Sequence, residues 1–483
     1  MAGGVNEAFV RTWSRLGTRF MPFADVATAE VPLSRLLRLA LFQLSVGMVQ
    51  TLFVGTLNRV MIVELAVPAS VVAIMLAIPL LVAPFRALVG FKSDTHRSVL
   101  GWKRVPYLWA GTLMQFGGLS IMPFALLVLS EAGQRAPVWA AWVTTGLAFL
   151  LVGAGAHTTQ TAGLALATDV VAEDKRPRVV ALMYLMMLLG TLVSALVLEQ
   201  LLRDFTPYKL IQVVQGTAVF TVVCNMVSLW RQEARVAGVV PYAKQERKPK
   251  FREAWRTFVA GGRAIRLLVA SGLGFFAFNL QDILLEPYGG EILRLSVSAT
   301  TGLTAIMALG AVFAFGLAAY SLKRSTDPIR LAATGVLVGV IGFAAVIFAS
   351  PFESTGMFQS GAMAIGFGEG LFGVGTLSFA MSLRDPSQHG IALGAWGAVF
   401  ATAEGLSFAL SGIMKDYFAH LVERGVLGTA LSIPSVPYSV VYHLEILVLF
   451  TTLVALGPLV RRRVSLAREE MVARPFGLAD IPA

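Results

Sequence analysis

Ionisable side chains inside long apolar stretches are the residues of this sequence whose types could do chemistry. Such groups are costly in hydrocarbon, so each is a candidate for a functional role or for a structural pair. Among these intramembrane groups, acids outnumber bases in the second half of the chain. The candidates for polar or coupling roles are Arg59, Glu64, Arg86, Asp282, Glu286, Glu291, Glu369 and Glu404.

These carboxyl groups allow two interpretations. In a medium of low dielectric constant a carboxyl group can exchange protons near neutral pH, which would support proton coupling. Alternatively, neutral carboxyl groups form hydrogen bonds between helices and have only a structural role. The sequence leaves both interpretations open.

Two histidines are candidates for ligand binding. His157 lies in GAGAHTTQT, where Gly153 and Gly155 make space and Gln160 supplies a polar partner. A neutral imidazole beside such space can accept a flat macrocycle and ligate its magnesium. His443, in the stretch YHLE, is the second candidate. The alternative for both is a histidine hydrogen-bonded between packed helices.

A glycine-rich stretch, GFGEGLFGVG, surrounds Glu369. Small residues at this density allow a backbone or a planar ligand to approach closely. Gly366, Gly368 and Gly370 are therefore candidate contacts of a flat ligand, and close helix packing is the competing use. The stretch is not a dinucleotide-binding motif, because no strand precedes it.

Motifs of enzyme chemistry are missing from the sequence. It contains no GxxxxGK phosphate loop, no HExxH, no GxSxG elbow and no kinase motif set. The lone Cys224 excludes a disulfide framework, a zinc ribbon and an iron–sulfur site. We therefore expect a protein that is not an enzyme and that holds no metal directly.

The composition indicates which elements must position these groups. Of 483 residues, 56% are apolar and only 14% are charged, whereas soluble domains are about 25% charged. Twelve apolar runs recur, each with the ~20 residues needed to cross the bilayer. They span residues 36–64, 68–91, 106–130, 138–168, 179–201, 208–230, 266–288, 296–322, 330–350, 356–383, 391–414 and 438–460. We predict an all-α integral membrane protein with twelve transmembrane helices.

The basic residues predict the topology. When alternate connections are assigned to one side, 31 Lys and Arg residues fall on that side and six on the other. This asymmetry predicts that both termini and the central linker are cytoplasmic. The net charge of +11 then reflects topology and anionic lipids rather than nucleic acid. Residues 1–35 have the pattern of a basic amphipathic arm on the membrane surface.

The two halves of the chain resemble each other. A run that begins at Gly47 reaches Glu64 at the same distance at which a run from Gly274 reaches Glu291. We predict two pseudo-symmetric six-helix bundles, with the functional surface between them. The predicted organisation is an arm (1–35), an N-terminal bundle (36–230), a basic linker (231–265), a C-terminal bundle (266–463) and a tail (464–483).

The loop after the second apolar run resembles the signature loop of the major facilitator superfamily. A glycine permits close helix approach, an acid caps or pairs, and basic residues hold the loop at the anionic leaflet. Tyr320 replaces the acid in the second half, so a gating role there is not expected. The loop residues are Gly90, Asp94, Arg97, Gly101, Lys103 and Arg104.

Longer stretches, including GTLNRVMIVELAVPASVVAIM and FNLQDILLEPYGGEIL, resemble the bacteriochlorophyll-delivery (PucC/LhaA) family of the major facilitator superfamily. The resemblance extends from about residue 17 to 465. It implies an assembly factor for bacterial light-harvesting complexes in the inner, intracytoplasmic photosynthetic membrane. Such a protein would bind or deliver bacteriochlorophyll a or a late precursor and chaperone antenna α and β polypeptides. Implied partners are these polypeptides, the complex of reaction centre and core antenna, and pigment-synthesis enzymes.

The resemblance leaves the client and the mode of action open. The extended terminal arms favour the LhaA members, which serve the core antenna around the reaction centre. A second hypothesis is a proton-coupled secondary transporter of a tetrapyrrole or another small amphipathic molecule. A third is a scaffold that kept the transporter fold without its cargo.

Overall fold

The computed structural model describes residues 31–81, 89, 92–93, 98, 102–129, 137–172, 176–233, 262–382 and 389–460. Within these ranges every regular element is a helix. Eleven of the described segments are long and apolar enough to span a membrane. The chain is therefore an all-α, multi-pass membrane protein, as predicted.

The first half contains α2 (Leu33–Leu39), α3 (Leu41–Gln50), the π-helices η2 (Thr51–Leu57) and η3 (Val60–Glu64), α4 (Ala69–Leu81), α6 (Val105–Leu129), α7 (Val138–Val170), α8 (Arg176–Leu201) and α9 (Pro207–Leu229). The second half contains α11 (Arg263–Leu280), the short 3₁₀-helix η6 (Gln281–Ile283), α12 (Leu285–Glu291), α13 (Val297–Lys323), α14 (Pro328–Ala349), α15 (Thr355–Ser382), α16 (His389–Glu423), η8 (Thr429–Leu431), α17 (Val436–Leu456) and η9 (Gly457–Leu459).

One predicted span differs from the structure in extent, and another is described only in part. The span predicted at 68–91 is described over α4, Ala69–Leu81, and of its residues after Leu81 only residue 89 lies within the described ranges. The span predicted at 391–414 belongs to α16, which continues to Glu423. The helix passes through Lys415 and Asp416 because both side chains find partners on other helices. Lys415, assigned to a loop in the topology count, is thus a helical residue.

Helix starts follow local capping chemistry. Thr206 caps α9 by accepting a hydrogen bond from the Lys209 amide, and Pro207 follows it. Asp327 caps α14 through the Ile329 amide, again with a proline next. A capping side chain followed by proline satisfies an orphan N–H and fixes a helical φ. These starts could therefore be read from sequence.

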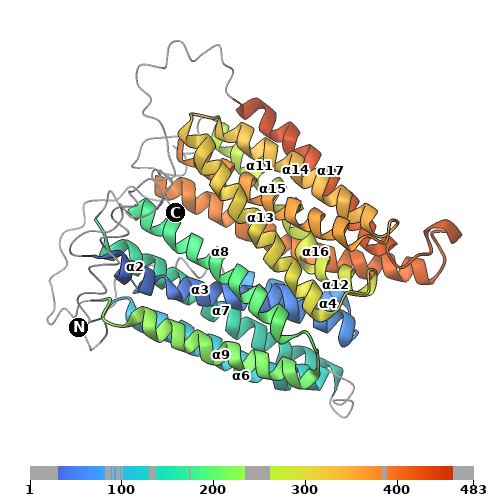
Figure 1. Ribbon diagram of the computed structural model, residues 1–483, viewed down its shortest axis with the longest axis horizontal. Helices are drawn as coiled ribbons and strands as arrows, with labels where there is room; N and C mark the ends of the chain where they lie inside the picture. Colours follow the sequence, from blue (N-terminus) through green and yellow to red (C-terminus); the bar gives the residue numbers. More distant parts are fainter. Residues whose placement is uncertain are drawn as a thin grey trace.

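The helices form two bundles, which are separated in Figure 1 as blue-to-green and yellow-to-red ribbons. In the N-terminal bundle, α3 packs on α8 and α9, and α6 packs on α7. In the C-terminal bundle, α15 packs on α13 and α14, and α11 packs on α16 and α17. The bundles meet along two helix pairs, α4 with α16 and α8 with α13.

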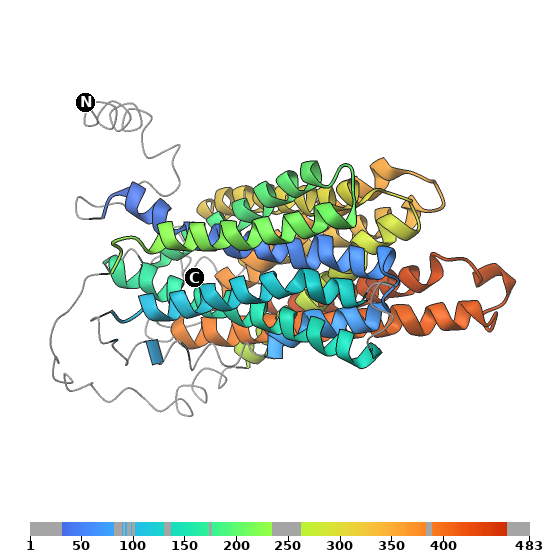
Figure 2. The same ribbon diagram turned by 90° about the horizontal axis from the view of Figure 1, so that it is seen from below.

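Both ends of the described chain lie at the same end of the molecule, which we call the termini end (Figure 1). The other end is called the opposite end. At the opposite end, the connection between α16 and α17 projects beyond the other helices (Figure 2). By the distribution of basic residues, the termini end is the predicted cytoplasmic side.

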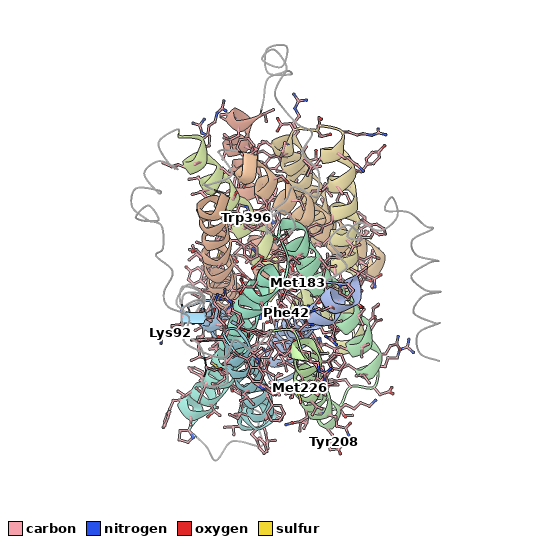
Figure 3. The ribbon with its side chains drawn as sticks, turned by 90° about the vertical axis from the view of Figure 1, so that its left-hand side faces the viewer. Phe42, Lys92, Met183, Tyr208, Met226 and Trp396 are labelled. Atoms are coloured by element: carbon pink, nitrogen blue, oxygen red, sulfur yellow. The ribbon has the colours of Figure 1, made fainter. Side chains whose placement is uncertain are left out.

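The buried core shows where the bundles join. Its largest cluster contains residues of both bundles, among them Leu57, Phe149 and Leu285. Two smaller clusters each belong to one bundle and lie toward the termini end. One includes Phe42 and Met183, which lie near the centre of the view in Figure 3; the other includes Leu322, Leu331 and Leu371. In the described ranges, the bundles therefore pack together mainly toward the opposite end.

Candidate functional site

The first segments of the two bundles are irregular at matching places. In the first bundle, α3 continues into the π-helices η2 and η3. In the second, α11 breaks at η6 before α12. These are the runs from Gly47 and Gly274 that match in sequence. Irregular turns inside transmembrane helices often mark functional sites, and polar contacts lie at both of these segments.

The two irregular segments meet across the bundle interface. The side-chain amide of Asn58 donates a hydrogen bond of 2.8 Å to the carbonyl oxygen of Ile283. The hydroxyls of Thr56 and Thr301 lie 3.2 Å apart. These contacts join η2 to the broken helix and to α13. We call this polar zone the bundle seam.

Arg59 is the buried cation of the seam, with only 3% of its surface exposed. Its guanidinium forms an ion pair with Glu64 and donates a hydrogen bond of 3.1 Å to the carbonyl oxygen of Leu295. A Cβ at Gly290 would lie 3.0 Å from Arg59 Nε, so this glycine makes room for the guanidinium. Arg59 thus connects the first bundle to the start of α13.

Glu286 faces Arg59 from the second bundle. One carboxylate oxygen accepts a hydrogen bond of 2.7 Å from Thr304, and the group interacts electrostatically with Arg59. The other carboxylate oxygen, Oε2, is buried and has no hydrogen-bond partner within the described residues. The predicted polar residues Arg59, Glu64 and Glu286 are therefore brought together by the fold.

Glu291 lies nearer the opposite end, between three elements. It accepts a hydrogen bond of 2.7 Å from the Tyr438 hydroxyl and lies 3.5 Å from Lys415 Nζ. The next residue of α16, Asp416, accepts hydrogen bonds from the amides of Ala69 and Ser70 at the start of α4. A side chain of one bundle thus caps a helix of the other.

A cluster of carboxyl groups lies inside the C-terminal bundle. Asp282, at the helix break, interacts electrostatically with Glu369 of α15 and Glu404 of α16. Glu445 of α17 in turn interacts with Asp282. Glu445 is fully buried, and neither of its carboxylate oxygens has a hydrogen-bond partner in the part of the chain that the structure describes. We call these four residues the acid cluster.

Three of the four members were predicted as coupling candidates, and Glu445 was not among them. It lies two residues after His443, in an apolar run. The sequence could have indicated Glu445 as a candidate, because it is a carboxyl group within a predicted transmembrane segment. Among the described residues, no group of three or more His, Cys, Asp or Glu side chains could hold a metal ion.

The space beside His157 differs from the expectation. His157 is half-buried on α7, but Gly153 faces Pro79 of α4, and a Cβ at Gly155 would lie 2.6 Å from the carbonyl oxygen of Gly111 on α6. Neighbouring helices therefore fill the space that was expected to admit a macrocycle, because small residues let backbones approach. Whether His157 binds pigment stays a prediction.

Gln160 and the glycines of α15 also lie at helix contacts. Gln160 is buried and lies 3.4 Å from both Gln43 and Met187. A Cβ at Gly366 would collide with the Met307 carbonyl of α13, and one at Gly368 would lie 2.6 Å from the Gly335 carbonyl of α14. A Cβ at Gly370 would lie 2.9 Å from Ala314. These contacts match the packing use of the glycines.

His443 lies on an exposed face of α17. Leu447, Phe450 and Val454 follow on the same face and are at least half exposed, as expected of side chains that contact lipid. The Nδ1 atom of His443 lies 2.6 Å from the carbonyl oxygen of Ser439. Because a carbonyl oxygen only accepts, this contact favours a proton on Nδ1, which in the neutral ring leaves the lone pair on Nε2. This tautomer suits a metal ligand.

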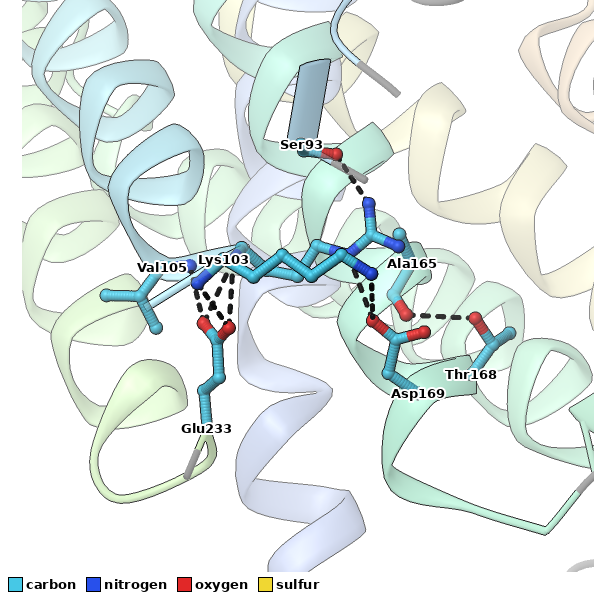
Figure 4. A network of polar contacts seen from close by, with 8 residues as sticks. Ser93, Lys103, Val105, Ala165, Thr168, Asp169 and Glu233 are labelled. Atoms are coloured by element: carbon cyan, nitrogen blue, oxygen red, sulfur yellow. Dashed lines mark hydrogen bonds and ion pairs between the residues drawn. The ribbon is translucent and has the colours of Figure 1, made fainter. Parts of the chain in front are cut away.

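The described part of the signature loop forms a polar network at the termini end (Figure 4). The Arg104 guanidinium bonds Asp169 at 3.0 Å and also Ser93. The Glu233 carboxylate accepts hydrogen bonds from the backbone amides of Lys103, Arg104 and Val105, and so caps α6. Asp169 and Glu233 were missed, because their partners are far away in sequence.

Several predicted residues lie outside the described ranges. They are Arg86, Gly90, Asp94, Arg97 and Gly101, with most of the arm 1–35 and of the linker 231–265 and all of the tail 464–483.

Comparison with known proteins adds a family relationship. The family model described as PUCC protein matches residues 56–464. A Rhodobacter capsulatus protein described as an uncharacterized protein in the puhA-bchM intergenic region is 50% identical over 97% of this chain and 98% of its own length. Protein PucC of Rhodovulum sulfidophilum is 51% identical over 88% of this chain and 94% of its own. The bacteriochlorophyll synthase 44.5 kDa chain of Rhodobacter capsulatus is 27% identical over 77% of this chain and 85% of its own.

Solved structures show the fold. A bacterial homologue of the lysosomal transporter Spinster, inward-facing and unoccupied, matches with a TM-score of 0.64 and 13% identity, over 88% of this chain and 94% of that one. An inward-facing bacterial homologue of the iron transporter ferroportin matches with a TM-score of 0.65 and 12% identity, over 88% and 98%. The chain therefore has the transporter fold expected from its signature loop and paired halves.

Proposed function

Because this chain belongs to the PucC protein family, we propose that it is an assembly factor for bacterial light-harvesting antenna complexes. In this proposal it binds or delivers bacteriochlorophyll a or a late precursor. It also chaperones the antenna α and β polypeptides into the ring around the reaction centre. It acts without enzymatic activity, in the inner photosynthetic membrane, beside the pigment-synthesis enzymes.

The observation that carries the proposal is the similarity to PucC proteins at about half of all positions over most of the chain. The further relative named for bacteriochlorophyll synthase supports a pigment context. The LhaA-type role, with the core antenna as client, is the version we favour. The basic arm and linker would hold the protein at anionic lipids near these partners.

The tautomer of His443 supports pigment binding at a lipid-facing position. A neutral imidazole with a free lone pair could ligate the magnesium of a bacteriochlorophyll. The contact of Nδ1 with the Ser439 carbonyl would leave Nε2 as the nitrogen that ligates a pigment. An amphipathic pigment could reach this face from the bilayer without entering the protein.

The experiment is to purify the protein gently from pigment-producing cells and record its absorption spectrum. We expect bound bacteriochlorophyll or a precursor, together with antenna polypeptides in the same pull-down. His443→Ala should lower the pigment-to-protein ratio, whereas His420→Ala, at an exposed histidine of α16, should not. Protein that carries neither pigment nor antenna polypeptides would contradict the proposal.

The runner-up is secondary transport of a tetrapyrrole or another small amphipathic molecule. It is favoured by bundles that join mainly toward one end and by the likeness of the fold to inward-facing transporters. Proton-driven uptake into vesicles tests it. Uptake that is lost in Asp282→Asn without loss of folding would favour transport; no uptake under any gradient would count against it.

A further inference from the structure

We propose that the acid cluster, Asp282, Glu369, Glu404 and Glu445, is a proton-binding site inside the C-terminal bundle, and that its occupancy controls the bundle seam. This inference goes beyond antenna assembly and does not depend on it. It rests on the composition of the cluster, on buried acceptors without donors, and on the position of Asp282 at the helix break.

The cluster gathers acids from four separate elements. Asp282 comes from η6, Glu369 from α15, Glu404 from α16 and Glu445 from α17. The groups that interact with Asp282 are Glu369, Glu404, Glu445 and the side-chain amide of Gln281. Several negative charges this close in a medium of low dielectric constant repel one another strongly. The cluster therefore requires bound positive charge to be stable.

The surroundings contain more hydrogen-bond acceptors than donors. Gln281 is fully buried and donates its amide N–H to Asp282, but its oxygen has no partner among the described residues. Both carboxylate oxygens of Glu445 are likewise without a partner there. Tyr442, also fully buried, interacts with Glu445 and with Tyr288. A buried acceptor needs a donor.

Protons meet both needs at once. A proton bound to a carboxylate removes one negative charge and creates an O–H group that can donate to a neighbouring acceptor. A metal ion is the weaker alternative, because the described carboxyl groups do not converge in a way that could hold one. The ligand that fits an acceptor-rich, acid-only cluster is the proton.

Asp282 links the cluster to the bundle seam. Its side chain faces the acids, while its own carbonyl oxygen and that of Ile283 accept from the Asn58 amide of the other bundle, at 3.4 and 2.8 Å. Arg59 and Glu286 lie on the neighbouring turns of the same two segments. A change of charge at Asp282 therefore acts on the backbone that holds the bundles together. We expect protonation to favour the joined opposite end and deprotonation to loosen it.

The test measures proton binding and bundle distance in the full-length protein. Spin labels are placed at the opposite end, on Tyr208→Cys of the N-terminal bundle and Phe352→Cys of the C-terminal bundle. Both positions are exposed, and Cys224→Ser removes the chain's one natural cysteine. The distance distribution is recorded at acidic and alkaline pH, and infrared difference spectra follow protonated carboxyl groups in the same samples.

The parent should show longer distances at alkaline pH and a carboxyl signal that titrates over the same range. Asp282→Asn/Glu445→Gln should keep the acidic distribution at every pH, because the amides mimic protonated acids. A distance distribution in this variant that matches the acidic distribution of the parent also shows that the variant is folded. Glu423→Gln, an exposed acid at the end of α16, should behave like the parent.

A parent distance that does not change with pH would overturn the proposal. So would a pH-dependent change that survives in Asp282→Asn/Glu445→Gln. Neither result involves pigment or antenna polypeptides, so failure here is distinguishable from failure of the proposed function.

Discussion

Arg59 and Glu286 occupy equivalent positions in the two halves of the chain and interact across the bundle seam. When Gly47 is aligned with Gly274, Arg59 falls on Glu286 and Glu64 on Glu291. Arg59 is buried, and Glu286 interacts with it electrostatically. A duplicated segment has thus acquired a basic residue in one copy and an acidic residue at the same position of the other.

Removing the cation should leave Glu286 without compensation. We expect Arg59→Met to destabilise the protein by about 1–3 kcal/mol, because the variant loses the ion pair with Glu64, the hydrogen bond to the Leu295 carbonyl and the interaction with Glu286. Arg59→Met/Glu286→Gln should recover part of that loss. Thermal unfolding of the four members of this cycle in detergent measures the coupling. If the losses of the single variants simply add, the two residues do not interact.

Asp416 should stabilise the start of α4 from the other bundle. Its carboxylate accepts hydrogen bonds from the amides of Ala69 and Ser70 at 3.1 and 2.7 Å. Loss of a capping side chain costs about 0.5–2 kcal/mol, so Asp416→Ala should speed amide hydrogen exchange in residues 69–73. Glu423→Ala, at the exposed end of the same helix, is the matched control. Equal exchange in both variants would contradict the cap.

Gly366 should be required for the contact between α15 and α13. A Cβ at this position would collide with the Met307 carbonyl, whereas a Cβ at Gly356 of the same helix would meet nothing within 4 Å. Gly366→Ala should therefore cost about 1–3 kcal/mol, measured as a lower unfolding temperature. Gly356→Ala should be neutral or slightly stabilising. If Gly366→Ala leaves the unfolding temperature unchanged, the packing role is contradicted and Gly366 remains a candidate contact of a flat ligand.

Glu233 should anchor α6 at the termini end. Its carboxylate accepts from three successive amides, Lys103 to Val105, and a negative charge there also complements the helix dipole. Glu233→Ala should lower stability by about 0.5–2 kcal/mol and speed exchange in residues 103–107. Asp204→Ala, at an acid with a 92% exposed side chain, should leave that exchange as in the parent. An unchanged rate in Glu233→Ala would show that other groups hold the helix start.

Much of the fold could be predicted from local sequence. The apolar run predicted at 330–350 is α14 at Pro328–Ala349, and the run at 208–230 is α9 at Pro207–Leu229. Each segment is transferred into hydrocarbon separately, so its own length and polarity are sufficient to predict that it spans the membrane. The match between Gly47 and Gly274 covers the two segments that the structure shows to be irregular, but the sequence did not predict their irregularity.

The candidate site needed more than sequence. Glu64 lies five residues from Arg59, so the sequence could suggest this pair. Glu286 lies 227 residues from Arg59, so the sequence could not suggest the second pair. The prediction of open space beside His157 was wrong, because Gly153 and Gly155 pack against other helices. A small residue permits close approach, but the sequence does not say what approaches.

The sequence by itself determined the membrane class, the positions of the helices, the paired halves and the family. These properties follow from composition, periodicity and motif, which are local or are shared along the whole chain. Only the tertiary structure decided that Asp282 interacts with Glu369, Glu404 and Glu445, that Arg59 interacts with Glu286, and that Nδ1 of His443 faces the Ser439 carbonyl. Electrostatic and hydrogen-bonding partners depend on distance and direction in space, and these are fixed only when the helices pack.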